Sequence, residues 1–405
     1  MAKVARNGYL ETLADLRDKN LIKVVTGARR VGKSTLLEQY QEMLKAEMPE
    51  ATVLFMNFDV PEYRLWAEKG WKAIYDAIFQ ALNPEKMNYV FFDEIQNVPR
   101  FEILLEGLFS HPKIDLYVTG SNACLLSSEL ATLLTGRAFE INVLPFSFTE
   151  YLEFTGNRSN PDRAFSDYLI TGGFPEAVNL AGINAGYSAR YLQAVYGSIY
   201  ENDIKTRHKI RSGLSYREVV NFLADSIGSP VSPGNIAKIL TNSGKKIDNK
   251  SVAKYISTLT DSYMFYRASR YDIKGKRHLA TQEKYYVVDT GLRGALLGRD
   301  LQSDKGHLLE NVVYLELLRR KNQVWVGKIG NAEVDFVARD GKGYIKYIQV
   351  SQTVKNPETL ARELAPFDKI PDHNEKILIT ADYENGSRNG IKQLNIVDWL
   401  MGKSE

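Results

Sequence analysis

A glycine-rich turn between a short apolar run and a helical pattern constrains the fold more than any other part of the chain. Residues 21–37 read LIKVVTGARRVGKSTLL. An apolar strand pattern at residues 22–25 precedes the motif G-x-x-x-x-G-K-S, and a helical pattern follows it. Gly27 and Gly32 let the backbone wrap round a phosphate with its N–H groups pointing inward, and the helix adds its positive dipole end. The stretch therefore predicts a phosphate-binding loop.

The side chains of this loop suit a nucleoside triphosphate. Lys33 would reach the β and γ phosphates, and the Ser34 hydroxyl would bind Mg²⁺. The alternative is a glycine turn with a surface lysine, and the strand and helix on either side argue against it. We expect ATP and Mg²⁺ here. Whether Arg29 and Arg30 touch phosphate, a neighbouring subunit or solvent stays open. The predicted nucleotide-binding set is Gly27, Arg30, Gly32, Lys33, Ser34 and Thr35.

Length and composition narrow the number of domains, the class of protein and the compartment that we expect. A chain of 405 residues is expected to hold more than one domain, and 44% hydrophobic with 25% charged residues is typical of a globular protein. No apolar run is long enough to span a membrane, and the first ten residues lack the apolar core of a signal peptide. The single cysteine, Cys124, fits a reducing compartment, so we expect a cytoplasmic protein.

A second apolar run ends in two acids. Residues 89–92 predict a buried strand, and Asp93 and Glu94 follow it directly. Asp93 would hold Mg²⁺ through water, while Glu94 would polarise the attacking water. By itself such a pattern is often only the end of a strand. Downstream of a phosphate-binding loop it is the Walker B pattern and indicates ATP hydrolysis.

Several segments together resemble prokaryotic AAA-type ATPases that carry a C-terminal domain of unknown function (number 4143). The resemblance spans nearly the whole chain and implies ATP use, whereas the task of that family is poorly defined. The segments that carry it are GARRVGKST, VFFDEIQNV, VTGSNACLLS, LTGRAFEINVLPFSFTEY, GGFPEAV, GHLLENVVYLELLRR and AEVDFV.

The AAA-type resemblance implies two further catalytic residues. A strand pattern at residues 114–119 leads to Ser121 and Asn122, and Asn122 is our choice for the polar sensor of the γ-phosphate, with Ser121 second. An ordinary helix cap is the alternative. Arg137 precedes a strand pattern at residues 138–143 and would act as an arginine finger on a neighbouring subunit. A surface arginine in a loop is the alternative for this position.

The order of patterns predicts an α/β protein with four parts. A parallel three-layer ATPase core of the AAA type occupies residues 1–155, because strand and helix patterns alternate there. A helical lid is expected at 156–212. Three helical patterns and a hairpin predict a winged-helix domain at 213–290. Residues 303–405 form a C-terminal α/β domain.

Charge is concentrated in the middle of the chain. Residues 205–284 contain 16 Lys and Arg against 6 Asp and Glu, although the whole chain has a net charge of only +3. Such a basic segment points to a polyanion, with DNA the first candidate, unless the charges are scattered over a solvated surface. The recognition helix and the hairpin tip of the winged helix would supply the DNA contacts. The residues are Lys250, Lys254, Lys274, Lys276 and Arg277.

The C-terminal part resembles the PD-(D/E)xK nuclease core, in which acids hold a divalent metal and a lysine assists the nucleophile. Glu310 and Asp335 match the acidic positions. Gln349 and Ser351 stand where the pattern requires Glu and Lys. Two of the four positions are therefore changed, and we expect an inactive nuclease-like domain.

Taken together, the patterns predict a Mg²⁺-dependent ATPase that couples hydrolysis to DNA binding or remodelling as a homo-oligomeric ring, such as a hexamer. Two rival functions stay open. One is a signalling ATPase switch of the STAND type that binds a protein partner, and the other is an ATP-regulated DNA nuclease. No membrane partner is expected.

Overall fold

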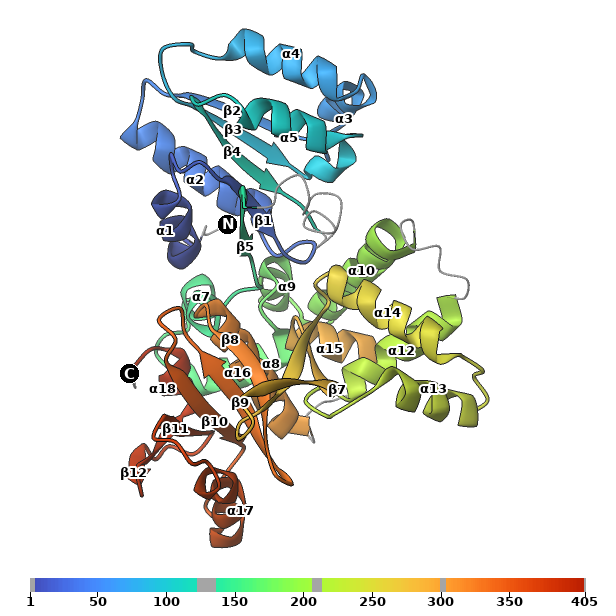
Figure 1. Ribbon diagram of the computed structural model, residues 1–405, viewed down its shortest axis with the longest axis vertical. Coiled ribbons are helices and arrows are strands. Elements are labelled where there is room, and N and C mark those ends of the chain that lie inside the picture. The colour runs from blue at the N-terminus through green and yellow to red at the C-terminus, as the bar shows by residue number, and fades with distance from the viewer. Residues whose placement is uncertain (1–3, 122–135, 206–212, 299–303, 404–405) are drawn as a thin grey trace. The chain divides into compact units, whose positions relative to one another are not determined.

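The computed structural model describes residues 4–121, 136–205, 213–298 and 304–403, and Figure 1 shows its elements. The chain divides into two compact units. The first consists of Met1–Val143 with Asp261–Tyr263, and the second of Leu144–Thr260 with Met264–Glu405. Within the described ranges, no helix is both long and apolar enough to cross a membrane.

The first unit is built on a five-stranded sheet in the order β2-β3-β4-β1-β5, and all neighbouring strands are parallel. Every residue of β1 and β3 is buried, because helices cover both faces of the sheet (Figure 1). The strands are β1 (Ile22–Thr26), β2 (Thr52–Asn57), β3 (Asn88–Asp93), β4 (Ile114–Thr119) and β5 (Ala138–Asn142). The helices are α1 (Asn7–Asp15), α2 (Lys33–Glu47), α3 (Pro61–Glu68), α4 (Trp71–Ala81) and α5 (Phe101–Phe109), with the 3₁₀ turn η1 (Ile95–Asn97).

Alternate side chains of β3 fill the cores on the two faces of this sheet. Val90 and Phe92 belong to the core that also contains buried residues of α4 and α5. On the other face the Phe91 ring stacks on Tyr117, with centroids 4.6 Å apart, and both rings contact Tyr40 of α2. This arrangement confirms the parallel three-layer α/β core.

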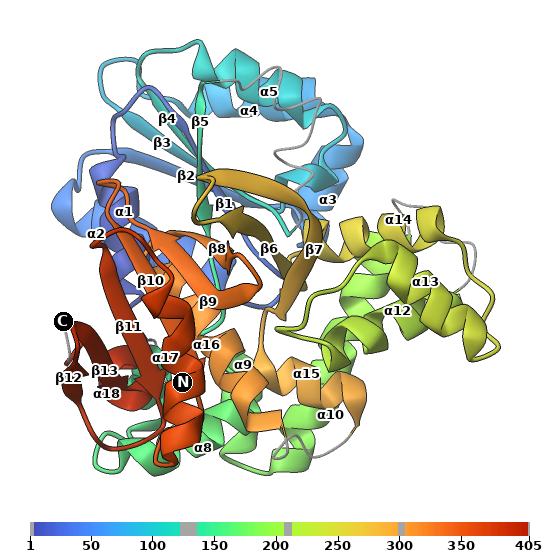
Figure 2. The ribbon, with the colours of Figure 1, turned by 60° about the horizontal axis from the view of Figure 1, so that its bottom comes forward.

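The second unit combines helices with an eight-stranded sheet in the order β12-β13-β11-β10-β9-β8-β6-β7 (Figure 2). Its strands are β6 (Phe265–Asp272), β7 (Arg277–Val287), β8 (Gln323–Ile329), β9 (Ala332–Arg339), β10 (Ile345–Ser351), β11 (Glu375–Thr380), β12 (Gly386–Arg388) and β13 (Ile391–Asn395). The helices before the hairpin are α7 (Phe148–Thr155), α8 (Pro161–Thr171), α9 (Pro175–Ala181), α10 (Ala185–Ile199), the π-helix η3 (Tyr200–Lys205), α12 (Gly213–Asp225), α13 (Pro233–Asn242) and α14 (Asn249–Asp261). After the hairpin come α15 (Thr290–Leu297), α16 (Lys305–Arg319), α17 (Pro357–Asp368) and α18 (Ile396–Leu400).

The hairpin β6–β7 differs from the expected arrangement. It follows α12, α13 and α14, in the order that the winged-helix prediction requires, but β6 also pairs in parallel with β8. The hairpin therefore forms one edge of the sheet that contains the C-terminal strands. A two-stranded hairpin alone is marginally stable, and pairing with β8 gives it a third strand. The expected division between 213–290 and 303–405 thus falls inside one sheet, and assignment of the helices to a winged helix remains a prediction.

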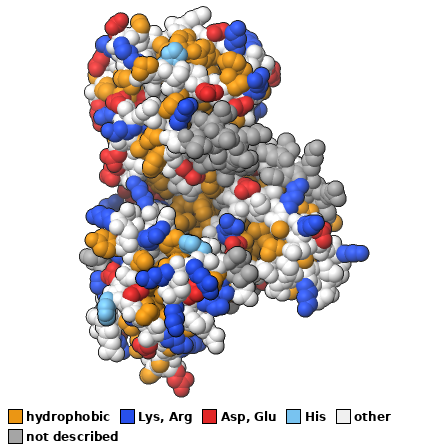
Figure 3. Space-filling view, viewed as in Figure 1, with side chains coloured by type: hydrophobic (Ala, Val, Ile, Leu, Met, Phe, Trp, Pro, Cys, Tyr) orange, Lys and Arg blue, Asp and Glu red, His pale blue; other side chains and the backbone are white. Residues whose placement is uncertain are grey.

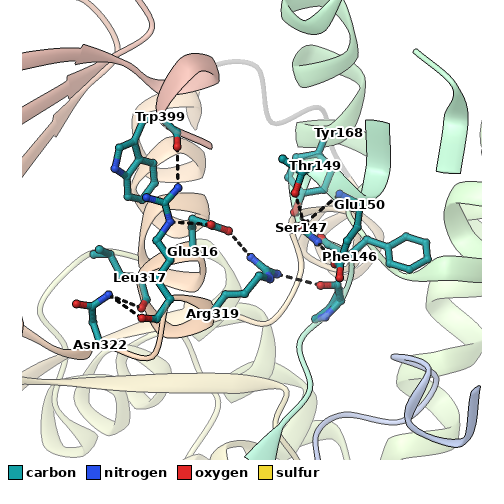
Figure 4. Close-up of polar contacts among 12 residues, drawn as sticks. Phe146, Ser147, Thr149, Glu150, Tyr168, Glu316, Leu317, Arg319, Asn322 and Trp399 are labelled. Carbon is teal, nitrogen blue, oxygen red and sulfur yellow. Dashed lines mark hydrogen bonds and ion pairs between the residues drawn. The ribbon is translucent and has the colours of Figure 1, made fainter. Parts of the chain in front are cut away.

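The start of the second unit is hydrogen-bonded to α16, which lies more than 150 residues later in the chain (Figure 4). Arg319 donates one hydrogen bond to the Pro145 carbonyl at 2.9 Å and another to Glu316 at 2.7 Å. Tyr168 of α8 donates to the Phe146 carbonyl at 2.8 Å. The segment that precedes the expected lid is therefore hydrogen-bonded both to α8 and to α16, and the bounds of the lid remain a prediction.

Candidate nucleotide-binding site

The phosphate-binding loop has the backbone that its glycines allow. It connects β1 to α2, which begins at Lys33. Gly27 has a φ of +133°, and a Cβ there would lie 2.3 Å from the Val143 carbonyl oxygen. Gly32 precedes α2 with a φ of 97°. Only glycine fits the first position without moving the backbone, so sequence and local structure agree on a strand–loop–helix phosphate site.

Lys33 is buried at the start of α2, with 4% of its side chain exposed. Its ammonium donates to the carbonyl oxygens of Gly27 and Ala28, both at 3.0 Å, and lies 3.9 Å from a Glu94 carboxylate oxygen. These carbonyls hold the ammonium against the loop itself. The lysine is thus already placed beside both the loop and the acid that directly follows β3.

The other side chains of the loop are more exposed to solvent than Lys33. Ser34 is half-buried, whereas Arg30 and Thr35 are exposed. Arg30 also has a left-handed backbone, with a φ of 68°. That conformation is uncommon for a residue with a side chain and costs on the order of 1–3 kcal/mol. Strain of this kind clusters at ligand sites, which agrees with the nucleotide role predicted for the loop.

The two acids lie at the carboxyl end of β3, the edge where ligands bind in parallel sheets. Asp93 is 1% exposed, and its carboxylate accepts hydrogen bonds from the Thr119 hydroxyl at 2.5 Å and the Asn57 amide at 2.9 Å. The Glu94 backbone N–H donates to the same Thr119 hydroxyl at 2.9 Å, and Gln96 donates to the Glu94 carboxylate. Glu94 has a left-handed φ of 54°.

Sequence reasoning missed Asn57, Thr119 and Gln96. Asn57 and Thr119 are the last residues of β2 and β4, the two strands that flank β3. Polar residues at the ends of neighbouring parallel strands were the available signal, but the strand order that makes them neighbours of Asp93 is a tertiary feature. Asn122, the predicted sensor, lies outside the described residues, whereas its alternative Ser121 is fully buried.

Arg137 lies away from the loop of its own chain. It directly precedes β5, and its carbonyl accepts from the Ile22 N–H at the amino end of β1. Because β5 and β1 are parallel, Arg137 is at the edge opposite the phosphate-binding loop, a strand length of roughly 17 Å away. The exposed guanidinium lies 5.9 Å from the Phe109 ring centroid and lines a cavity of about 610 Å³ with Asp18 and Glu106. Arg137 could therefore complete only the site of another subunit.

The five predicted DNA contacts, Lys250, Lys254, Lys274, Lys276 and Arg277, are all exposed. Figure 3 shows Lys and Arg side chains projecting from the surface of helices α12 to α14. Part of the basic excess, however, is internal. Arg270 and Lys284 are buried and pair with acids of the C-terminal sheet. Lys245 is exposed, but it pairs with Glu218 at 2.6 Å.

Three of the four predicted nuclease-like positions lie close together. The Gln349 side chain accepts from the Asp335 N–H at 2.9 Å, and the Lys284 ammonium lies 3.0 Å from Glu310 and 4.0 Å from Asp335. Burial, with repulsion from Glu310, raises the pKa of Asp335 to about 8. Ser351 lies on the same strand as Gln349, but its hydroxyl donates to a nearby backbone carbonyl. Sequence reasoning missed Lys284, since only the sheet brings β7 to this place.

Comparisons with known protein families support the ATPase core that we describe for the first unit. Residues 19–152 match the family described as AAA domain, and residues 162–303 match a domain of unknown function numbered 8612. The second match ends where the C-terminal part begins, so the domain numbered 4143 that we expect there remains a prediction. An uncharacterized protein of Haemophilus influenzae is 37% identical over 411 residues, which cover 99% of each chain. The uncharacterized protein MJ1544 of Methanocaldococcus jannaschii is 28% identical over 90% of this chain and 83% of its own.

Two solved structures align with 73% of the chain. The Walker-type ATPase PABY2304 of Pyrococcus abyssi is 19% identical, with 73% of this chain and 96% of that chain covered and a TM-score of 0.49. The Orc1 protein of Aeropyrum pernix in complex with DNA is 14% identical, with 73% and 92% covered and a TM-score of 0.35. From the matches in sequence, the chain belongs to the family of the Haemophilus influenzae protein, and its first unit is an α/β core of the AAA type.

Proposed function

We propose that the chain is a Mg²⁺-dependent ATPase that works as an oligomer and couples ATP hydrolysis to the binding or remodelling of DNA. The observation that carries the ATPase proposal is the meeting of Lys33, Asp93 and Glu94 at one edge of the parallel sheet, with Lys33 and Glu94 3.9 Å apart. Phosphoryl transfer needs positioning and charge stabilisation, and this edge offers a cation, a metal-binding acid and a second acid together.

The residues at this edge fit Mg²⁺. Ser34 and Asp93 offer a hydroxyl and a carboxylate, which are the hard oxygen donors that Mg²⁺ prefers. Asp93 already accepts two hydrogen bonds, but a carboxylate has about four lone-pair sites, so it keeps capacity for a metal-bound water. When bound, Mg²⁺ would neutralise charge on the phosphates. Thr119 and Asn57 would hold Asp93 in the orientation required.

Each catalytic side chain then has a separate role. Lys33 would bind the β and γ phosphates, and Glu94 would orient the attacking water and accept its proton. The Gln96 hydrogen bond to Glu94 would fix the direction of that carboxylate. Asn122 stays a proposal for the γ-phosphate sensor. Arg137 would add its charge to the γ-phosphate held by a neighbouring subunit, which supports the proposal of an oligomer.

The DNA part of the proposal is supported by the exposed cations of the second unit. Lys250 and Lys254 lie on one helix, while Lys274, Lys276 and Arg277 lie where β6 turns into β7. Lysines and arginines contact phosphates and give an affinity that falls with salt and depends little on sequence.

The test is ATP turnover with and without single-stranded, duplex and four-way-junction DNA, with Lys33→Ala as the inactive reference. DNA should raise turnover, and the double variant Lys274→Ala, Lys276→Ala should lower the slope of log affinity against log salt by roughly 2. Lys45→Ala, Lys72→Ala, which removes the same charge from exposed positions of the first unit, should leave that slope unchanged. Failure to bind any of the three DNAs at low salt would overturn the DNA proposal, and a nucleotide-driven change of oligomeric state that ignores DNA would favour the signalling switch.

A further inference from the structure

A buried lysine lies among three carboxylates in the second unit. Lys284 is on β7, and 4% of its side chain is exposed. Its ammonium lies 2.8 Å from Glu333, 3.0 Å from Glu310 and 4.0 Å from Asp335. Glu310 comes from α16, and Glu333 and Asp335 come from β9. We call Glu310, Glu333 and Asp335 the acidic cluster.

We infer that the Lys284 ammonium takes the place of a divalent metal ion in the acidic cluster, so that this nuclease-like end of the chain is held by an internal cation. The inference is independent of the proposed ATPase function. It concerns a different unit and a different set of side chains.

The first support is the position of the ammonium. A nuclease of the resembled kind holds a dication between its acids and keeps the lysine beside the nucleophile. Here the lysine nitrogen is itself within hydrogen-bond distance of two acids and near the third. A dication on the same carboxylates would lie within a few ångströms of this buried cation, and the repulsion between them would be strong in an environment of low dielectric.

The second support is that neighbouring protein donors already bind oxygens of two of these acids. Asp335 accepts from the Val350 N–H at 2.8 Å, and Glu310 accepts from the Tyr286 hydroxyl at 2.6 Å. Gln349, at the third ligand position, accepts from the Asp335 N–H and donates to Glu363 at 3.2 Å. In the ranges that the structure describes, no three Asp, Glu, His or Cys residues are arranged to hold a metal.

The third support is electrostatic. A buried charge is retained only where partners compensate it, and Glu333 and Glu310 lie 2.8 and 3.0 Å from the Lys284 ammonium.

The ion pairs between Lys284 and the acidic cluster also have a structural effect. In the sheet, β6 and β8 separate β7 from β9, yet Lys284 joins β7 to two acids of β9 and to α16. The hairpin that carries the proposed DNA contacts is in this way fixed to the nuclease-like strands. Because Lys284, and not a metal ion, holds the acidic cluster, the hairpin stays fixed at any concentration of divalent cations.

The first experiment uses the full chain without nucleotide. Free Mn²⁺ is followed by electron paramagnetic resonance during titration of the wild type and of Asp335→Asn. We expect the two proteins to bind the same number of Mn²⁺ ions, because the acidic cluster contributes no site. A site that is present in the wild type and lost in Asp335→Asn would overturn the inference.

The second experiment removes the internal cation. Lys284→Gln should lower the midpoint of thermal unfolding without metal, and millimolar Mn²⁺ should raise that midpoint more than it does in the wild type. Lys346→Gln is the control, since this lysine lies on β10, 3.3 Å from Glu375, but with 42% of its side chain exposed. It should show the wild-type response. A Lys284→Gln protein that responds to Mn²⁺ no more than the wild type would count against the inference, and if it does not fold, the Asp335→Asn comparison still decides.

Discussion

At the scale of single residues, the Thr119 hydroxyl connects the two acids of the candidate site. It donates to the Asp93 carboxylate and accepts from the Glu94 N–H. The hydroxyl touches neither phosphate nor water in our proposal, so Thr119 is a positioning residue. Its effect depends on keeping the Asp93 carboxylate oriented and on satisfying a buried N–H.

We predict that Thr119→Val, which keeps the shape and removes the hydroxyl, lowers kcat for ATP roughly 10–100-fold, as loss of a supporting hydrogen bond at a metal site commonly does. ATP affinity should change little, because the phosphate-binding loop is intact, and the Mg²⁺ concentration for half-maximal rate should rise. Steady-state kinetics at varied Mg²⁺ measures both. The control is Thr155→Val, whose hydroxyl donates only within its own helix, to Tyr151. An unchanged Mg²⁺ dependence would show that Thr119 is merely structural.

At the scale of elements, one carboxylate joins the loop before α9 to the start of α15. Asp289 is 3% exposed and accepts hydrogen bonds from the N–H groups of Gly173 at 2.6 Å and Leu292 at 2.8 Å. Glycine is required at both positions, since a Cβ at Gly172 would lie 2.1 Å from Asp289 and a Cβ at Gly173 would lie 2.4 Å from the Phe146 carbonyl oxygen. Burial raises the pKa of Asp289 to about 6, and the backbone N–H groups partly offset this shift.

This shift predicts a specific pH dependence of stability. Because the folded protein binds the Asp289 proton more tightly than the unfolded chain does, the free energy of unfolding should fall as pH rises from about 4 to about 6 and then level off. The contribution is about 3 kcal/mol, since one pKa unit corresponds to about 1.4 kcal/mol. Asp289→Asn should lose this dependence and keep a pH-independent cost for the altered hydrogen bonds. Chemical denaturation from pH 4 to 7 measures the difference, and a wild-type minus variant difference that is constant across this range would refute the prediction.

At the scale of the whole molecule, the position of Arg137 makes the proposed active site incomplete in one chain. The arginine is at the sheet edge opposite the loop that holds Lys33, so it must act on another copy if it acts in catalysis. An oligomer in which each subunit supplies an arginine to its neighbour satisfies this condition.

We predict that Arg137→Ala binds ATP normally but loses hydrolysis, by 10³-fold or more as for other arginine fingers. Lys33→Ala should also be inactive. A mixture of the two should recover part of the activity, because some interfaces then combine an intact loop with an intact arginine. Arg64→Ala is the control, since Arg64 is an exposed arginine of the same unit that pairs with Asp59. A mixture that forms mixed oligomers but stays inactive would exclude the shared site.

Short-range patterns in the sequence set the local parts of this protein. The loop from Gly27 to Ser34, the strand that ends in Asp93 and Glu94, and the alternation of strands and helices are set by short-range spacing. They were therefore predictable from residues close in the chain. Glu310, Asp335 and Gln349 are far apart in the chain, and only the resemblance to a nuclease core, not their spacing, led us to expect them together.

Which distant residues come into contact depends on the three-dimensional fold. Thr119 and Asn57 reach Asp93 because strand order places β2 and β4 beside β3, and no spacing in the sequence reveals that order. Lys284 reads as part of a basic surface segment, yet pairing of β6 with β8 brings it into the acidic cluster. The sequence shows how many charged side chains a segment contains. Burial and pairing, which depend on the fold, decide whether those side chains are exposed to a partner or form ion pairs with one another.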